Sequence, residues 1–257
     1  MHMSFRTLGQ QMGMQLIRSI LDESIDVYLN AAILEKTKIE LINSIGVNLQ
    51  YNVDLQSSSM NSINFFKNLY RYSRFALDKH NANYVKYYNV NNGYYEINIP
   101  VADSLSTNSL TKEECLITPM MYLGFSLEYD EISKGSATAC RMVGDDIIET
   151  TLRDYCNSAD KKNPIITVVG YTPPDRLVGP VTITSEYIKV YTNQPNCDIK
   201  YINVKYIKTP NIVKYDLNPN ECVNCDLPEY CHFEIVEKAV QKYNISVKQN
   251  NVSVNSK

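Results

Sequence analysis

The cysteine-rich segment near the carboxy end holds the residues whose types and spacing come nearest to a chemical site. Cys222 and Cys225 are separated by two residues, and the adjacent pair Cys231 and His232 follows. Thiolate and imidazole groups are the preferred ligands of zinc, and the first pair has ligand-like spacing. Cys231 and His232 argue against one shared ion, because neighbouring side chains on the helix predicted to start there diverge by about 100°. We therefore expect structural thiols, with a zinc-stabilised binding module as the alternative.

Three groups of acidic residues offer oxygen ligands or acid–base groups: Glu113 with Glu114; Glu128 with Asp130 and Glu131; and Asp145 with Asp146. Carboxylates of this kind bind divalent metals or transfer protons. None of the spacings specifies a mechanism, and such clusters are usually solvated or capping groups. A metal-dependent hydrolase that uses Glu128 or Asp130 is accordingly the weaker alternative.

Other catalytic patterns do not occur in the chain. The three histidines are His2, His80 and His232, and none has a Ser-His-Asp or Cys-His setting. Neither a GxxxxGK[ST] loop nor a GxGxxG turn is present, so nucleotide binding by those backbone cradles has no support. We expect a non-enzymatic protein without a cofactor, and we assign no catalytic, cofactor-binding or metal-binding residue.

One stretch combines basic and aromatic side chains that suit a phosphate backbone: Arg71, Arg74, Lys79 and Lys86, with Tyr70, Tyr72, Tyr84, Tyr87 and Tyr88. The whole chain has a formal net charge of -3, so any contact with nucleic acid would be local. We interpret the stretch as an ordinary helix face and the loop after it. The alternative is non-specific contact with DNA that passes through a ring.

The first secondary-structure elements expected along the chain are helices. Ile25, Leu29, Ala32 and Ile33 recur at helical spacing and predict a helix from Asp22 to near residue 46. A short helix is expected within residues 8–21 and another over about 60–77. The helical period returns after residue 229, while the tail 244–257 has no obvious core partner and is expected to be ordered only by a neighbouring subunit.

The middle of the chain has the period of β-strands. Asn92 and Gly93 form a tight-turn signal just ahead of alternating apolar residues at 94–100. Further strands are predicted at 165–170, 181–191 and 199–207, which are dense in β-branched and aromatic residues. A short helix is predicted at 144–152, and proline-containing loops at 161–164 and 171–174.

This order of elements predicts an α+β fold, in which the N-terminal helices and the C-terminal helix form a helical bundle with an inserted β-rich domain. We expect the divisions 1–83, 84–226 and 227–257. No stretch approaches the roughly 18 apolar residues of a membrane span, so we expect a soluble protein without membrane contact. Seven scattered cysteines suggest reduced thiols, and 20 tyrosines without tryptophan suit surfaces that become buried on assembly.

Three segments resemble the head-to-tail adaptor proteins of short-tailed bacteriophages and the ring proteins of crAss-like phages. They are Ser24-Ile-Asp-Val-Tyr-Leu-Asn-Ala-Ala32; Tyr95-Glu-Ile-Asn-Ile-Pro100 followed by Asp103; and Leu227-Pro-Glu-Tyr-Cys-His-Phe-Glu-Ile-Val-Glu-Lys-Ala-Val240. The resemblance covers most of the chain in order. The long middle and the cysteine-rich turn at 222–231 depart from the simplest members.

The resemblance implies a structural virion protein and no catalytic residue. Such a subunit is a connector that joins the portal protein to the next tail or ring component and lines the DNA passage. It implies a homo-oligomeric ring, usually a dodecamer, at the head–tail junction of a virion assembled in the host cytoplasm. The tail 244–257 is then expected to bind the portal.

Overall fold

The computed structural model describes residues 1–14, 19–51, 64–77, 86–89, 93–102, 119–129, 137–154, 158–178, 181–193 and 199–254. Helices lie toward both ends of the chain and strands between them, so the fold is mixed α and β. The chain divides into two compact units: a helical unit, Met1–Leu69 with Pro210–Lys257, and a β unit, Tyr70–Thr209. These boundaries differ from the expected ones after residues 83 and 226, because the strand at 70–76 belongs with the β unit and the segment 210–226 with the helices.

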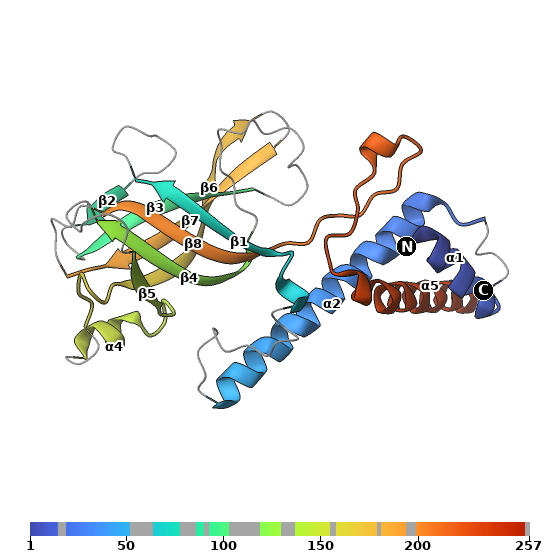
Figure 1. Ribbon diagram of the computed structural model, residues 1–257, viewed down its shortest axis with the longest axis horizontal. Helices are drawn as coiled ribbons and strands as arrows, with labels where there is room; N and C mark the ends of the chain where they lie inside the picture. The colour runs from blue at the N-terminus through green and yellow to red at the C-terminus, as the bar shows by residue number, and fades with distance from the viewer. Residues whose placement is uncertain are drawn as a thin grey trace. The chain divides into compact units, whose positions relative to one another are not determined.

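The helical unit contains α1 (His2–Gln11), α2 (Asp22–Tyr51) and α5 (His232–Val254) (Figure 1). α5 contacts both other helices, and the ring of Tyr243 lies 6.1 Å from that of Phe5 and 5.5 Å from that of Tyr28, centroid to centroid. The first turn of α2 carries Asp22 and Glu23, whose negative charges favour the positive end of the helix dipole. None of the described helices combines enough length with enough apolar character to cross a lipid bilayer.

The buried side chains of these helices recur at intervals of three or four residues, which places them on one side of each helix. The apolar ones are Phe5, Ile25, Leu29, Ala32, Ile33, Ile235, Val236, Ala239 and Val240. Full burial of one large aliphatic or aromatic side chain is worth about 1.5–3 kcal/mol. The periodicity that predicts α2 therefore marks the side of the helix that is buried in its own unit.

Three helix predictions need correction. The first helix begins at His2 and ends at Gln11, where the positive φ of 79° at Gly13 turns the chain, instead of lying within 8–21. α2 passes residue 46 and ends at Tyr51. α5 continues through most of the expected disordered tail to Val254, because residues beyond 243 have partners in the unit: the hydroxyl groups of Tyr28 and Ser246 are 2.9 Å apart and form a hydrogen bond.

A polar cluster fastens the start of α1 to the start of α2. The two ring nitrogens of His2 lie 3.2 Å from Asp22 Oδ1 and 2.7 Å from Asp26 Oδ1. Arg6 donates to Asp22 Oδ1 at 2.8 Å and to the carbonyl oxygen of Ile20 at 2.9 Å. The hydrogen bond from Arg6 is the main reason that the pKa of Asp22 is lowered.

The β unit contains β1 (Tyr70–Ala76), β2 (Lys86–Asn89), β3 (Tyr94–Ala102), β4 (Pro119–Tyr129), β5 (Thr138–Met142), β6 (Ile165–Val178), β7 (Val181–Tyr191) and β8 (Ile199–Lys208). These strands form one sheet in the order β1-β8-β4-β5-β6-β7-β3-β2. Neighbours are antiparallel except β5 and β6, which pair in parallel over two residues. The strand predictions at 94–100, 181–191 and 199–207 are confirmed, because alternating apolar residues give each strand one face that can be buried.

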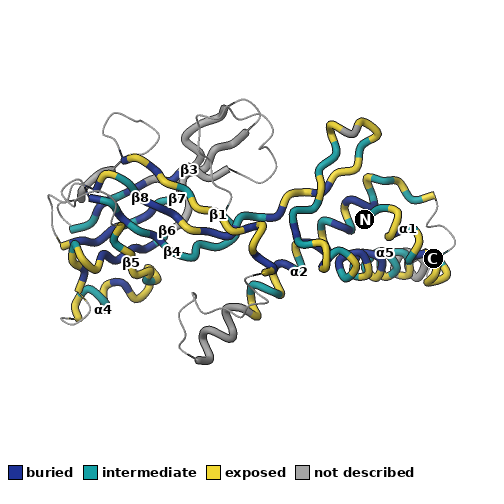
Figure 2. Tube along the Cα trace, viewed as in Figure 1, coloured by how far each residue is buried: buried dark blue, intermediate teal, exposed yellow. Residues whose placement is uncertain are grey.

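One hydrophobic core contains side chains from strands near both edges of the sheet. Phe75, Leu127 and Val204 come from β1, β4 and β8, and they belong to the same buried cluster as Ile97 and Ile188 from β3 and β7. A single flat sheet face would not bring these strands together, so the sheet must curl around its core. Figure 2 shows the buried positions that recur along the central strands.

Two predictions in this region are wrong. The helix expected over 60–77 is wrong over its second half: residues 64–66 are helical, but Tyr70 to Ala76 form β1, because they pair residue by residue with Ile207 to Tyr201 of β8. The expected loop at 171–174 lies inside β6, where a register shift against β7 between Thr172 and Arg176 accommodates the two prolines of the segment. Tertiary pairing decides the conformation in both cases.

The predicted short helix at 144–152 corresponds to α4 (Ile148–Arg153). It contributes Ile148 to a small second cluster with Ala159, Ile165 and Tyr191. α4 therefore packs against strands β6 and β7 through residues outside the main core of the sheet.

Candidate interaction surface

The cysteine-rich turn is held by hydrogen bonds within its own segment. Cys222 Sγ accepts from the backbone N–H of Asp216 at 3.3 Å and donates to the carbonyl oxygen of the same residue at 3.1 Å. Burial raises the pKa of both Cys225 and Cys231, which disfavours the thiolate form that binds metals. These thiols act as structural groups of the turn.

His232 is turned to a backbone partner. Its Nε2 atom donates to the carbonyl oxygen of Leu227 at 3.1 Å, so the proton on that nitrogen blocks its lone pair. Among the described residues, no group of three or more His, Cys, Asp or Glu side chains is arranged to hold a metal ion. Cys222, Cys225, Cys231 and His232 thus lie close in sequence without forming a ligand set.

Two of the acidic candidates that the structure describes, Glu128 and Asp145, make ion pairs with basic side chains of the β unit. Glu128 pairs with Arg74 and accepts a hydrogen bond of 2.9 Å from Asn203. That hydrogen bond, together with the charge of Arg74, lowers the pKa of Glu128. Lys189 donates to Asp145 at 3.2 Å. Residues 113, 114, 130 and 131 lie outside the described residues.

The basic and aromatic stretch lies partly on β1, and not on the helix that we expected. Arg74 packs over the ring of Tyr201 at 3.8 Å from the centroid, in addition to its ion pair with Glu128. Tyr70 and Tyr72 are exposed beside it. The side chains at 79, 84 and 86–88 lie outside the description. Arg74 thus ties β1 to β8 and β4, whereas Arg71 donates to the carbonyl oxygen of its neighbour Tyr70 at 2.8 Å.

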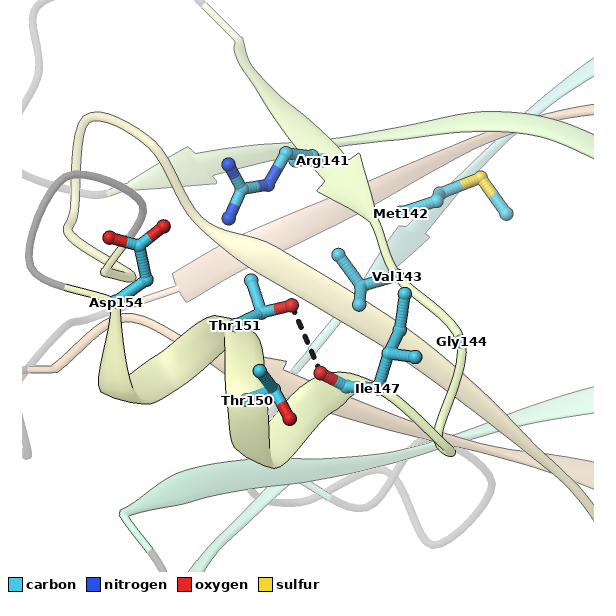
Figure 3. A pocket seen from close by; sticks show the side chains of 8 residues that line it. All are labelled: Arg141, Met142, Val143, Gly144, Ile147, Thr150, Thr151 and Asp154. Atoms are coloured by element: carbon cyan, nitrogen blue, oxygen red, sulfur yellow. Dashed lines mark hydrogen bonds between the residues drawn. The ribbon is translucent and has the colours of Figure 1, made fainter. Parts of the chain in front are cut away.

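A pocket of about 390 Å³ lies beside α4 (Figure 3). Its lining is Arg141, Met142, Val143, Gly144, Ile147, Thr150, Thr151 and Asp154. The Thr151 hydroxyl donates to the carbonyl oxygen of Ile147 at 3.0 Å, as it does in many helices. No histidine, cysteine or serine lines the pocket; its hydroxyl groups come from Thr150 and Thr151, and its one carboxylate comes from Asp154.

The most distinctive surface of the helical unit is a row of exposed residues along α2, which we name the α2 stripe: Glu23, Val27, Ala31, Leu34, Lys38 and Ile42. Successive members are three or four residues apart, so they share one side of the helix, away from its buried positions. Val27 is 65% exposed and Ile42 is 67% exposed. α2 therefore has apolar side chains on two sides, and its own unit covers only one of them.

α5 carries a similar row, the α5 stripe: Phe233, Glu237, Gln241, Ile245 and Lys248. Phe233 is 68% exposed, and exposed positions recur along this helix in Figure 2. Neither Lys38 of the α2 stripe nor Glu237 of the α5 stripe has an ion-pair partner within the described part of the chain. Large exposed apolar side chains in such rows are typical of surfaces that are covered on assembly.

Sequence reasoning did not single out these stripes. The apolar residues of α2 were visible, but a periodic pattern cannot separate a side buried within the subunit from a side buried between subunits. The signal was the presence of apolar residues on both sides of one helix. Neither a protein-family model nor a curated protein matches this chain.

Proposed function

We propose that this protein is a head-to-tail adaptor, or connector, of a short-tailed bacteriophage related to the crAss-like group. It forms a homo-oligomeric ring, a dodecamer in the simplest arrangement, that joins the portal protein to the next tail or ring component. Its place is the head–tail junction of the virion. The role is structural and requires neither a cofactor nor a catalytic residue.

The observation that carries the proposal is the pair of exposed stripes on one compact helical unit. A ring subunit must offer two different surfaces, one to each neighbour, because a head-to-tail contact uses unlike faces. The α2 and α5 stripes are two such surfaces on different helices. Both combine exposed apolar groups with a few charges, as interfaces that exclude water commonly do.

The order of the units supports the same role. The helices come from the two ends of the chain, and the β unit occupies the sequence between them. In the proposal the helices form the bundle of an adaptor and the β unit is its inserted domain. The three segments that resemble phage adaptors coincide with parts of α2, β3 and the start of α5.

The polar residues are used in a manner that suits a structural protein. Glu128, Arg74 and Asn203 join three strands, and the cysteine-rich turn bonds within itself. The chain has a formal net charge of -3, so in the proposal its contact with passing DNA is weak and non-specific. The proposed function therefore rests on surfaces and not on a reactive group.

The test is native mass spectrometry of the full chain, alone and mixed with portal rings of the same phage. We expect the chain to add to the portal in a ring-sized set, and portal rings of an unrelated phage serve as the matched control. A chain that binds neither itself nor its own portal would overturn the proposal. Stoichiometric zinc without portal binding would support the zinc module instead.

A further inference from the structure

The α2 stripe from Val27 onward matches the α5 stripe in length, and the two stripes are similar in chemistry. From Val27 to Ile42 and from Phe233 to Lys248 the chain advances by the same number of residues, which corresponds to about 22 Å along each helix. Each stripe has a large apolar residue at one end and a single charge one turn further in: Ile42 and then Lys38, Phe233 and then Glu237. The charges are opposite, so the two surfaces are complementary.

An antiparallel alignment brings these groups together in order. Ile42 then lies opposite Phe233, and Lys38 opposite Glu237, one turn along both helices. Leu34 meets Gln241, and Ala31 meets Ile245, where the small alanine lets the helices approach. Val27 meets Lys248 at the far end, so this alignment leaves one charge opposite an apolar side chain where the parallel one leaves three. Antiparallel helices that pack through residues three and four apart are a common geometry in proteins.

Other alignments of the two helices place fewer side chains opposite a suitable partner. In a parallel alignment Ala31 lies opposite Glu237, and Lys38 lies opposite Ile245, so each charge faces an apolar side chain. Two copies of the α2 stripe can also pair with each other, with Glu23 opposite Lys38. That symmetric contact closes a dimer, leaves Ile42 beyond the overlap and leaves the α5 stripe exposed.

We infer that the α2 stripe of one subunit packs antiparallel against the α5 stripe of the next copy of the same chain. This inference rests on the proposed ring function and names its subunit contact. The contact is between unlike faces, which is the kind of contact that generates a ring when the rotation between successive subunits closes. Both stripes are exposed in the single chain, so neither has to be uncovered before the contact can form.

Charge reversal with rescue tests the contact. Lys38→Glu and Glu237→Lys each place like charges opposite each other and should raise the concentration for half-assembly by about tenfold or more. The double variant Lys38→Glu with Glu237→Lys restores an opposite pair and should return assembly to near the wild-type level. Assembly is measured by sedimentation velocity and native mass spectrometry of the full chain, with and without portal rings.

Substitution of the apolar residues at the ends of the stripes gives a second test of the contact. Ile42→Asp and Phe233→Asp should abolish ring formation, because each places an unpaired charge in the contact. Leu217→Asp is the matched control, since Leu217 is 91% exposed and belongs to neither stripe. All these sites lie on the surface, so circular dichroism should stay at the wild-type level, as should the unfolding midpoint measured below the concentration for half-assembly.

The outcomes separate this contact from the proposed function. If the wild type forms rings that Lys38→Glu and Glu237→Lys leave intact, the contact is wrong and the adaptor role stands. Rescue of Lys38→Glu by Glu23→Lys, and not by Glu237→Lys, would replace it with a symmetric α2 pair. A wild-type chain that stays monomeric alone and with its portal would overturn both.

Discussion

The side-chain amide of Asn30 forms two hydrogen bonds with the backbone of Val213. Its Nδ2 atom donates to the Val213 carbonyl oxygen at 2.9 Å, and its Oδ1 atom accepts from the Val213 N–H at 2.7 Å. One side chain of α2 thus replaces the strand partner that this extended backbone would otherwise need. One turn earlier, Asp26 accepts from the N–H of Tyr215 at 3.0 Å. The segment after β8 is therefore fastened along α2 before the chain enters α5.

Replacement of Asn30 by alanine should destabilise the helical unit. The change leaves a partly buried N–H and a carbonyl oxygen of Val213 without their partner, which costs about 1–3 kcal/mol in the free energy of unfolding. Urea denaturation of the full chain measures the loss. Asn43→Ala, at an exposed position of the same helix outside the α2 stripe, is the control and should stay within about 0.5 kcal/mol. Equal effects of the two changes would contradict the role of Asn30.

Asp22 should make stability depend on pH in the acid range. Its pKa is lowered in the folded protein, so its contribution is fully present above the unfolded pKa of about 3.9 and is lost as the pH falls through the lower folded pKa. Asp22→Asn should therefore unfold more easily than the wild type at pH 7, with the difference shrinking below about pH 4. Urea midpoints across pH 7 to 2.5 test this. A difference that does not change with pH would refute the link.

Phe75→Ala should strongly destabilise the β unit. Phe75 is buried in the main core from β1, and removal of such a ring costs about 3–5 kcal/mol. Tyr72 lies on the same strand with its side chain exposed, so Tyr72→Ala should change the free energy of unfolding by no more than about 0.5 kcal/mol. Thermal unfolding followed by near-ultraviolet circular dichroism compares the two. Similar losses would mean that residue 75 does not face the core.

Chelation should leave the fold unchanged. Cys225 and Cys231 have raised pKa values through burial, and His232 donates Nε2–H to Leu227, so the turn does not depend on a metal. We expect the same melting temperature before and after treatment with a zinc chelator. The double variant Cys222→Ser with Cys225→Ser should also fold. Release of one zinc per chain together with unfolding would establish the zinc module in its place.

The amino-acid sequence by itself determined the elements whose patterns are local. Asp22 and Glu23 ahead of a helical period locate the start of α2, and Pro228 precedes α5 as expected for a first helical turn. The alternation in β7 and β8 identifies those strands because each has one face to bury. The absence of familiar catalytic spacings likewise follows from the sequence alone.

Only the tertiary structure decided the elements and contacts that depend on distant residues. The segment from Tyr70 to Ala76 is a strand because β8, more than a hundred residues later, supplies its backbone partners. The sequence shows only that an asparagine occupies position 30 of a helix; its role depends on the backbone of Val213, which lies against it in the folded chain. The α2 stripe became recognisable for the same reason: periodicity shows that α2 has apolar residues on two sides, whereas packing against α1 and α5 decides which side is covered.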